Sequence, residues 1–328
     1  MSTTERVLEL LENNVGQNIS GAYMAKQLGV SRTAVWKAVN SLRKNGYSVS
    51  AITNNGYCFA NDNDVLSVQG IAQFLSKKSD PGKINIFESL ESTNKTAKEF
   101  AVSGAEHGTI IIADSQTAGR GRYGRSFFSP PGHGIYMSFI IRPTNWLWAN
   151  APTLVTFHAA VTVCGAIEST TEKTPQIKWV NDVYIDGKKI CGILTEAVTD
   201  IESGGMQWIV VGIGVNFSLP STGLPEGIEH TAGAVFSEGK PTITRNRLAA
   251  EIANRILGDE GKYSRESLLA EYRKRLMMIG KRVTVSGWDE PFEAIAEDID
   301  ETGRLIVKKE NGETMALSAG EIRIREAG

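Results

Sequence analysis

The chain has 328 residues, of which 41% are hydrophobic, so it is long enough for two or three domains with a sizeable core. Its formal net charge is −2, yet residues 1–60 carry six basic against three acidic side chains, which concentrates positive charge at the N-terminus. The three cysteines lie far apart, which argues against a disulfide framework or a paired-cysteine metal site. No apolar run approaches the roughly 20 residues of a membrane span, so we expect a cytoplasmic protein without membrane contact.

The first 60 residues predict a DNA-binding unit. Apolar residues recur at helical spacing from Thr4 to Asn13, and Ser20 and Ser31 cap two further helices. Alternating strands around Asn55-Gly56 then predict a hairpin, which completes a winged helix-turn-helix. Basic residues near a helix end can also serve only to offset its dipole, but the hairpin and the positive charge favour contact with DNA. The expected DNA-binding residues are Ser31, Arg32, Thr33, Lys37, Asn40 and Lys44.

The next segment predicts an α+β domain whose helices gather on one face of a sheet. A polar stretch at Asn61–Asp64 marks the expected domain boundary. Ser92-Thr93-Asn94 precedes a predicted helix, where such residues ordinarily act only as a cap. The other expected elements are helices at Val68–Lys78 and about Ala149–Glu168, and strands at Ile84–Glu88 and Gly134–Ile141.

A glycine- and arginine-rich loop, Thr117–Pro130, is the most informative stretch; we call it the lid. Its glycines permit unusual backbone angles, and its arginines suit phosphate or carboxylate groups. From Ser115 through Ile167 the chain has no acidic residue, which favours an anionic ligand. A flexible surface loop is the plain alternative. The loop also matches a dinucleotide-binding pattern, but the residues after it cannot begin the helix that this motif requires.

A second informative stretch is a predicted hairpin of Ile177–Ile185 and Lys188–Glu196, joined by Asp186-Gly187. In a two-residue turn Asp182 opposes Cys191, and Lys178, Asp182 and Lys189 share one face. Lys189 and Asp182 are then diagonal neighbours roughly 7–8 Å apart, which is within reach of their side chains. These charges could be solvated edge positions, but their grouping favours a polar site in which a lysine stabilises phosphate and a carboxylate handles an amine.

Beyond this hairpin we expect a buried strand, Met206–Asn216, followed by a mobile loop over Ser218–Gly233. Helices are predicted at about Ile243–Leu257 and Arg265–Met277. From Gly280 the pattern changes to short alternating strands, which predict a small antiparallel barrel as a third domain.

Five motifs in this order resemble the bifunctional biotin protein ligase and biotin operon repressor family: Glu91-Ser-Thr-Asn94, Gln116–Arg122, Lys178–Asp182, Gly187–Ile193 and Gly212–Asn216. The resemblance covers essentially the whole chain. It implies a winged helix-turn-helix at residues 1–64, a class II synthetase-like ligase domain with a mixed or antiparallel sheet at 65–279, and an SH3-like β-barrel at 280–328.

The resemblance also implies the chemistry. Biotin and ATP, with Mg²⁺, would form biotinyl-5′-AMP, and biotin would pass to a lysine of a biotin carboxyl carrier protein. The adenylate would act as corepressor for a homodimer on operator DNA. Catalysis would fall to Lys189, Asp182 and Arg122. Biotin would be bound by Ser92, Thr93, Asn94, Gln116, Arg120, Gly121, Arg122, Lys189 and Gly192, and ATP or the adenylate by Arg122, Phe127, Lys178, Asn181 and Asn216, with Mg²⁺ near Asn216.

Two positions depart from the family pattern, which usually has proline at Val180 and tryptophan at Phe127. Neither change removes a polar group from the expected site. Two alternatives remain: a lipoate or octanoate ligase on a related fold, and a transcription factor that only senses a metabolite. The Ser92–Asn94 and Gln116 set argues against the first alternative, and the presence of Lys189 with Asp182 argues against the second.

Overall fold

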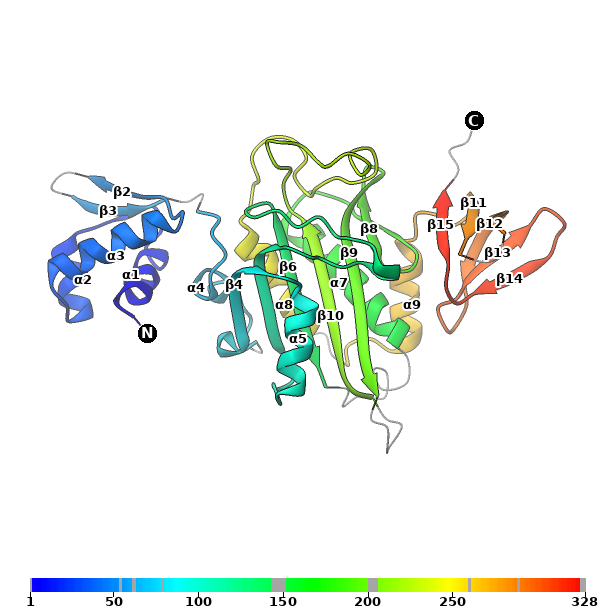
Figure 1. Ribbon diagram of the computed structural model, residues 1–328, viewed down its shortest axis with the longest axis horizontal. Helices are drawn as coiled ribbons and strands as arrows, with labels where there is room; N and C mark the ends of the chain where they lie inside the picture. The colour runs from blue at the N-terminus through cyan, green and yellow to red at the C-terminus, as the bar shows by residue number, and fades with distance from the viewer. Residues whose placement is uncertain are drawn as a thin grey trace.

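The computed structural model describes residues 2–52, 55–60, 63–77, 79–142, 152–199, 206–258, 261–287 and 290–324. Three parts lie in a row, with a small helical unit at one end, a large sheet in the middle and a small sheet at the other end (Figure 1). No helix within these ranges is long and apolar enough to cross a membrane.

The N-terminal part is a winged helix-turn-helix, as predicted. It contains α1 (Thr3–Glu12), α2 (Gly21–Leu28) and α3 (Arg32–Lys44) against a sheet ordered β1-β3-β2, with β1 (Asn18–Ile19), β2 (Val49–Ile52) and β3 (Gly56–Phe59). Ser20 and Ser31 cap their helices by accepting from Tyr23 N and Ala34 N. Gly56 begins β3, and a Cβ there would lie 2.1 Å from Ile19 O, so only glycine allows β1 to pair with β3.

The central sheet has seven strands in the order β4-β5-β6-β10-β9-β8-β7. Only β4 and β5 are parallel, and every other neighbouring pair is antiparallel, so the sheet is mixed. The strands are β4 (Ile84–Leu90), β5 (Thr109–Gln116), β6 (Gly134–Ile141), β7 (Gln176–Lys178), β8 (Asp182–Ile185), β9 (Lys188–Thr199) and β10 (Met206–Asn216).

Helices cover both faces of this sheet, which corrects the expectation of helices on one face only. The helices α7 (Pro152–Thr170), α8 (Arg245–Gly258) and α9 (Arg265–Lys274) lie behind it, whereas α5 (Thr93–Val102) lies in front (Figure 1). The reason is visible in β6, whose eight residues are all buried. Ile135, Met137 and Phe139 pack toward the large core, and Ile140 joins the smaller core beneath α5.

The helix predicted at Val68–Lys78 is much shorter than expected. It is α4 (Val68–Ala72), capped by Ser67, and Lys78 lies outside the described residues. Beyond it, the side chain of Asn254 on α8 accepts from Ser76 N at 2.7 Å and donates to Phe74 O at 2.8 Å. These tertiary bonds satisfy the backbone groups that further helix would have used. Short 3₁₀ turns occur at η1 (Pro81–Lys83) and η2 (Arg122–Gly124).

The C-terminal part is an antiparallel sheet ordered β14-β13-β12-β11-β15. Its strands are β11 (Arg282–Ser286), β12 (Phe292–Ile299), β13 (Leu305–Lys309), β14 (Thr314–Leu317) and β15 (Glu321–Ile324). The last strand was not predicted, because Glu321–Ile324 is short and charged. The sheet is joined to the central part through one continuous apolar core and through Trp179, whose indole donates to Gly303 O at 3.0 Å.

Candidate functional site

A cavity of about 170 Å³ lies at one end of the central sheet, on the face that carries α5. The lid forms one wall of it, and residues 320–322 of the C-terminal part form another. All but one of the residues predicted for the ligase site line this cavity, namely Ser92, Thr93, Asn94, Gln116, Arg120, Gly121, Arg122, Phe127, Lys178, Asn181, Asp182, Lys189 and Gly192. The exception is Asn216.

Glycines on β10 make room for the cavity. Along this strand Ile213 and Val215 belong to the large core, so Gly212 and Gly214 face the opposite side. A Cβ on Gly212 would lie 2.1 Å from Asn94 Oδ1, and one on Gly214 would lie 2.7 Å from the Phe127 ring. Both positions must therefore lack a side chain, because Asn94 of α5 and Phe127 of the lid pack directly against the backbone of β10.

The Ser92–Asn94 segment is a polar cluster rather than a simple helix cap. Ser92 occupies the cap position of α5 but its side chain makes no capping hydrogen bond, although the residue is only 3% exposed. Gln116 Oε1 accepts from Thr93 N at 2.9 Å, and the Ser138 hydroxyl lies 2.7 Å from Asn94 Oδ1. These bonds fix Thr93 and Asn94 and leave the Ser92 hydroxyl uncommitted to the helix.

Asn94 is held from the other side as well. Its Nδ2 donates to Leu194 O at 3.1 Å and to Glu196 Oε2 at 2.8 Å, both on β9. Because its two donors point at β9 and its oxygen at β6, the amide orientation is determined by its partners.

The lid is ordered by its own backbone. Gly121 N donates to Arg125 O at 2.7 Å, and Phe127 N donates to Gly119 O at 2.8 Å. Tyr123 adopts the left-handed conformation at the bend, with φ of 56°.

The three lid arginines diverge to different partners. Arg122 Nη1 donates to Asn181 Oδ1 at 3.2 Å across the cavity. Arg120 lies 3.7 Å from Glu91, and Arg125 forms an ion pair with Glu321 on β15. The lid therefore bridges the central sheet and the C-terminal part.

The predicted Lys–Asp pair is present, and the two side chains are in contact. Lys189 Nζ lies 2.7 Å from Asp182 Oδ1. The predicted register was wrong, because Asp182 opposes Gly192 rather than Cys191. A β-bulge between β8 and β9 inserts one residue, so Ile190 and Cys191 are both fully buried while Lys189 and Gly192 both line the cavity.

Lys178 completes the charged floor of the cavity. Burial lowers the pKa of Lys178 from its usual range, and the neighbouring Asp182 carboxylate opposes that effect. Lys178 stands opposite Asp182 in the register of β7 and β8, and Lys189 forms the ion pair with the same carboxylate. This excess of positive charge suits a ligand that carries phosphate.

Asn216 lies outside the cavity. Its Nδ2 donates to Gly233 O at 2.9 Å at the end of the 218–233 loop, and Lys189 N donates to Thr231 O at 2.8 Å in the same segment. This end of the loop is thus tied to β9 and β10. Within the described residues, no group of three His, Cys, Asp or Glu side chains is close enough to hold a metal ion. The predicted place of Asn216 beside ATP and Mg²⁺ stays a prediction.

The two departures from the family pattern are accommodated. Phe127 fills the space left by Gly192 and Gly214, so an aromatic ring stands where the prediction required one. Val180 is buried, its peptide bond with Trp179 is cis, and its carbonyl accepts from the Tyr272 hydroxyl at 3.0 Å.

The predicted DNA-binding face of α3 is largely solvent-exposed. Arg32, Thr33, Lys37 and Lys44 are exposed, and Asn40 is half-buried. Arg43, in the last turn of α3, donates to Val49 O at 2.7 Å and thereby holds the β2–β3 hairpin against the helix. Sequence reasoning missed Trp36, which is 55% exposed in the middle of this face. The available signal was its spacing from Arg32, Thr33 and Asn40, which places Trp36 with the outward residues of the helix.

Several residues in and beside the ligand cavity were also missed. Two of them are on β6, which was predicted only as a buried strand. Tyr136 lines the cavity and donates to Pro130 O at 3.1 Å, and Ser138 lies behind the lining and bonds to Thr93 and Asn94. Alternation with Ile135 and Met137 was the available signal. Glu321 and Ile322 carried no signal, because nothing in the sequence relates the last strand to the lid.

A polar cavity with a lysine–aspartate pair and an arginine lid, built on a mixed sheet and joined to a winged helix-turn-helix, defines a ligase-type domain that carries its own DNA-binding unit. Residues 86–216 match the biotin/lipoate A/B protein ligase family, residues 3–58 an HTH domain, and residues 278–325 the biotin protein ligase C-terminal domain. The bifunctional ligase/repressor BirA of Bacillus spizizenii is 34% identical over 95% of this chain and 96% of its own length. The chain belongs to this family of biotin protein ligases, which confirms the predicted resemblance.

Further relatives support this assignment. The BirA protein of Bacillus subtilis is 38% identical over 78% of this chain and 77% of its own length. That of Escherichia coli is 26% identical over 98% of this chain and 97% of its own length. Among solved structures, the biotin protein ligase from Aquifex aeolicus in complex with biotin and ATP is 25% identical, with a TM-score of 0.62, and covers 74% of this chain and 99% of its own length.

Proposed function

We propose that this protein joins biotin to ATP to form biotinyl-5′-AMP and pyrophosphate, and then transfers biotin to one lysine of a biotin carboxyl carrier protein. The observation that carries the proposal is the ion pair of Lys189 and Asp182, at 2.7 Å, in a cavity covered by the arginine lid. The family membership supports the identity of the substrates, as does the similarity to the biotin protein ligase from Aquifex aeolicus in complex with biotin and ATP.

In the first step the biotin carboxylate attacks the α-phosphorus of ATP, a carbon–oxygen–phosphorus bridge forms, and pyrophosphate leaves. Negative charge gathers on the α-phosphate oxygens, and we assign Lys189 and Arg122 to stabilise it, because both carry donors into the cavity. Lys178 and Asn181 would contact the nucleotide phosphates, and Phe127 would cover the adenylate.

The biotin ring system and its tail would occupy the polar cluster beside α5. The Ser92 hydroxyl makes no capping hydrogen bond and is available to a ligand. The cluster therefore offers donors and acceptors that suit a ureido group, from Ser92, Thr93, Asn94 and Gln116. Gly192 allows a close approach of the tail, and Arg120 and Gly121 would close over it.

In the second step the carrier lysine attacks the acyl carbon, an amide forms and AMP leaves. The attacking amine must be neutral, and we assign Asp182 to receive its proton. An acyl adenylate is hydrolysed by water, so the lid must stay closed until the carrier arrives. A Mg²⁺ ion accompanying ATP would be held chiefly by phosphate oxygens and water, as this ion prefers.

We further propose that the three parts of the chain have different functions. Residues 1–64 would bind operator DNA, residues 65–279 would bind biotin and ATP, and residues 280–328 would complete the ligase. The three family matches support this division. Two weakly bound winged helices on a palindromic operator gain affinity when they are joined, so adenylate-driven dimerisation would make biotinyl-5′-AMP the corepressor.

Incubation with radiolabelled biotin and ATP, followed by addition of a carrier domain, tests the ligase directly. We expect label on the carrier, and Lys189→Ala should slow adenylate formation by about 10²–10³ while biotin affinity changes less, since the ammonium acts where charge develops. Label from octanoate or lipoate instead of biotin would favour the related ligase chemistry. No transfer from any of the three acids would leave only a metabolite sensor.

A further inference from the structure

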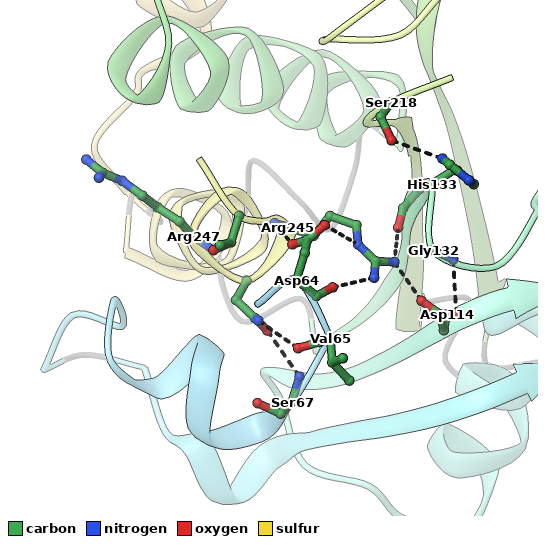
Figure 2. A network of polar contacts seen from close by, with 12 residues as sticks. Asp64, Val65, Ser67, Asp114, Gly132, His133, Ser218, Arg245 and Arg247 are labelled. Carbon is green, nitrogen blue, oxygen red and sulfur yellow. Dashed lines mark hydrogen bonds and ion pairs between the residues drawn. The ribbon is translucent and has the colours of Figure 1, made fainter. Parts of the chain in front are cut away.

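Arg245, the first residue of α8, lies at the centre of a buried polar network (Figure 2). Its side chain is only 4% exposed. Arg245 Nε lies 2.9 Å from Asp64 Oδ2 and Nη1 lies 2.6 Å from Asp114 Oδ1. Further bonds run from Nη1 to Gly134 O at 3.2 Å and from Nη2 to Asp64 O at 2.5 Å. The guanidinium is thus shared by two carboxylates and two carbonyl groups.

The partners of Arg245 come from three separate places in the chain. Asp64 belongs to the segment that connects the DNA-binding part to the ligase. Asp114 is on β5, shortly before the lid, and its other oxygen accepts from Gly132 N at 3.1 Å, shortly after the lid (Figure 2). Arg245 therefore ties the interdomain connection to both ends of the lid.

The network continues toward the DNA-binding part. Asn246 accepts from Ser67 N at 3.1 Å and donates to Val65 O at 2.8 Å, which holds the connecting segment against α8. The Ser67 hydroxyl donates to Glu12 Oε1 on α1 at 3.0 Å. These contacts connect α1 to the segment that carries Asp64.

We propose that Arg245 is a positioning residue that couples the placement of the DNA-binding part to closure of the lid. When Asp64 is docked, the guanidinium is fully engaged and holds Asp114 and the Gly132–Gly134 turn in place. When the connecting segment moves, Arg245 loses one of its two counter-charges in a buried site, where an unmatched charge is strongly unfavourable. The ends of the lid then loosen. This inference deepens the proposed function and rests on it for the identity of what the lid retains.

Limited trypsin digestion of the full-length, ligand-free protein tests the coupling without any assumption about activity, because the lid offers cleavage sites after Arg120, Arg122 and Arg125. Asp64→Asn and Arg245→Lys are the test variants. Arg275→Lys is the matched control, since Arg275 is 16% exposed and pairs with Glu168 and Glu271 on α7 and α9, away from the lid. Cleavage after Arg282, within β11, reports global unfolding.

We expect both test variants to be cut in the lid about tenfold faster than the wild type, as a local opening becomes easier, with unchanged cleavage after Arg282. The Arg275→Lys variant should retain the wild-type rate of lid cleavage. Equal lid cleavage in wild type and Asp64→Asn overturns the proposal, and so does an equal acceleration in Arg275→Lys, which would indicate a general loss of stability. Absence of adenylate synthesis would instead defeat the proposed function and leave the digestion result intact.

Discussion

Gly212 provides a sharp test of how the cavity is built. In Gly212→Ala the new methyl group would lie 2.1 Å from Asn94 Oδ1 and 2.8 Å from Asn94 Cγ, far inside contact distance. The neighbouring atoms belong to a buried amide held by partners on β9 and β6, so Asn94 cannot simply swing aside. The Asn94 side chain must therefore leave its position, which breaks these hydrogen bonds.

The size of the effect follows from those bonds. Asn94 donates to the Glu196 carboxylate at 2.8 Å and to Leu194 O at 3.1 Å. A bond to a charged group contributes about 1.5–3 kcal/mol and a neutral bond about 1 kcal/mol, so displacement of Asn94 costs roughly 2–4 kcal/mol. If Asn94 contacts biotin, we expect biotin affinity to fall about 30-fold or more, measured by titration calorimetry.

A double-mutant cycle separates this explanation from general damage to the sheet. In an Asn94→Ala background the obstructing amide is absent, so Gly212→Ala should have little further effect on biotin affinity. Gly258→Ala is the neutral control, because a Cβ there meets nothing within 4 Å. An equal loss of biotin affinity in both backgrounds would show that collision with Asn94 is not what requires glycine at position 212.

Arg122→Ala removes the lid's bond to Asn181, so biotinyl-5′-AMP should escape faster in a stopped-flow chase, while a rate equal to that of the wild type would contradict the assigned role. A fragment of residues 65–328 should lose DNA binding but still form adenylate, with faster ligand loss because Asp64 is missing; a folded but inactive fragment would refute this. Burial raises the pKa of Glu12 to about 7 from 4.5, so the folded state binds the proton more tightly and stability should fall as pH rises from about 5 to 8. Thermal unfolding of Glu12→Gln across this range should show a weaker pH dependence than the wild type.

The charged hairpin shows what local patterns can and cannot predict. Asp186-Gly187 specifies a tight turn, and both residues adopt the positive φ angles that such a turn needs, so the pairing of Tyr184 with Lys189 followed directly. The bulge at Ile190 could not be foreseen, since it depends on packing against the core. It placed Gly192 in the position opposite Asp182, where the regular register had Cys191.

Contacts between residues far apart in the chain could not be predicted either, because they also depend on the tertiary structure. The Ser92 hydroxyl looked like a cap, and only the observed geometry of α5 shows that it makes no capping bond. Arg245 looked like an ordinary helix residue, because its partners lie about 130 and 180 positions away in the chain. Side chains that act through distant partners leave no periodic signal.

The wall contributed by residues 320–322 has a consequence for synthesis of the protein. Every other wall of the cavity comes from residues 92–214, which leave the ribosome much earlier than Glu321. Before residue 321 is made, the central sheet can fold, but Arg125 lacks its ion-pair partner Glu321 and the cavity is open on that side. Order of synthesis therefore delays completion of the cavity wall until residues 320–322 have been made and β15 has joined its sheet.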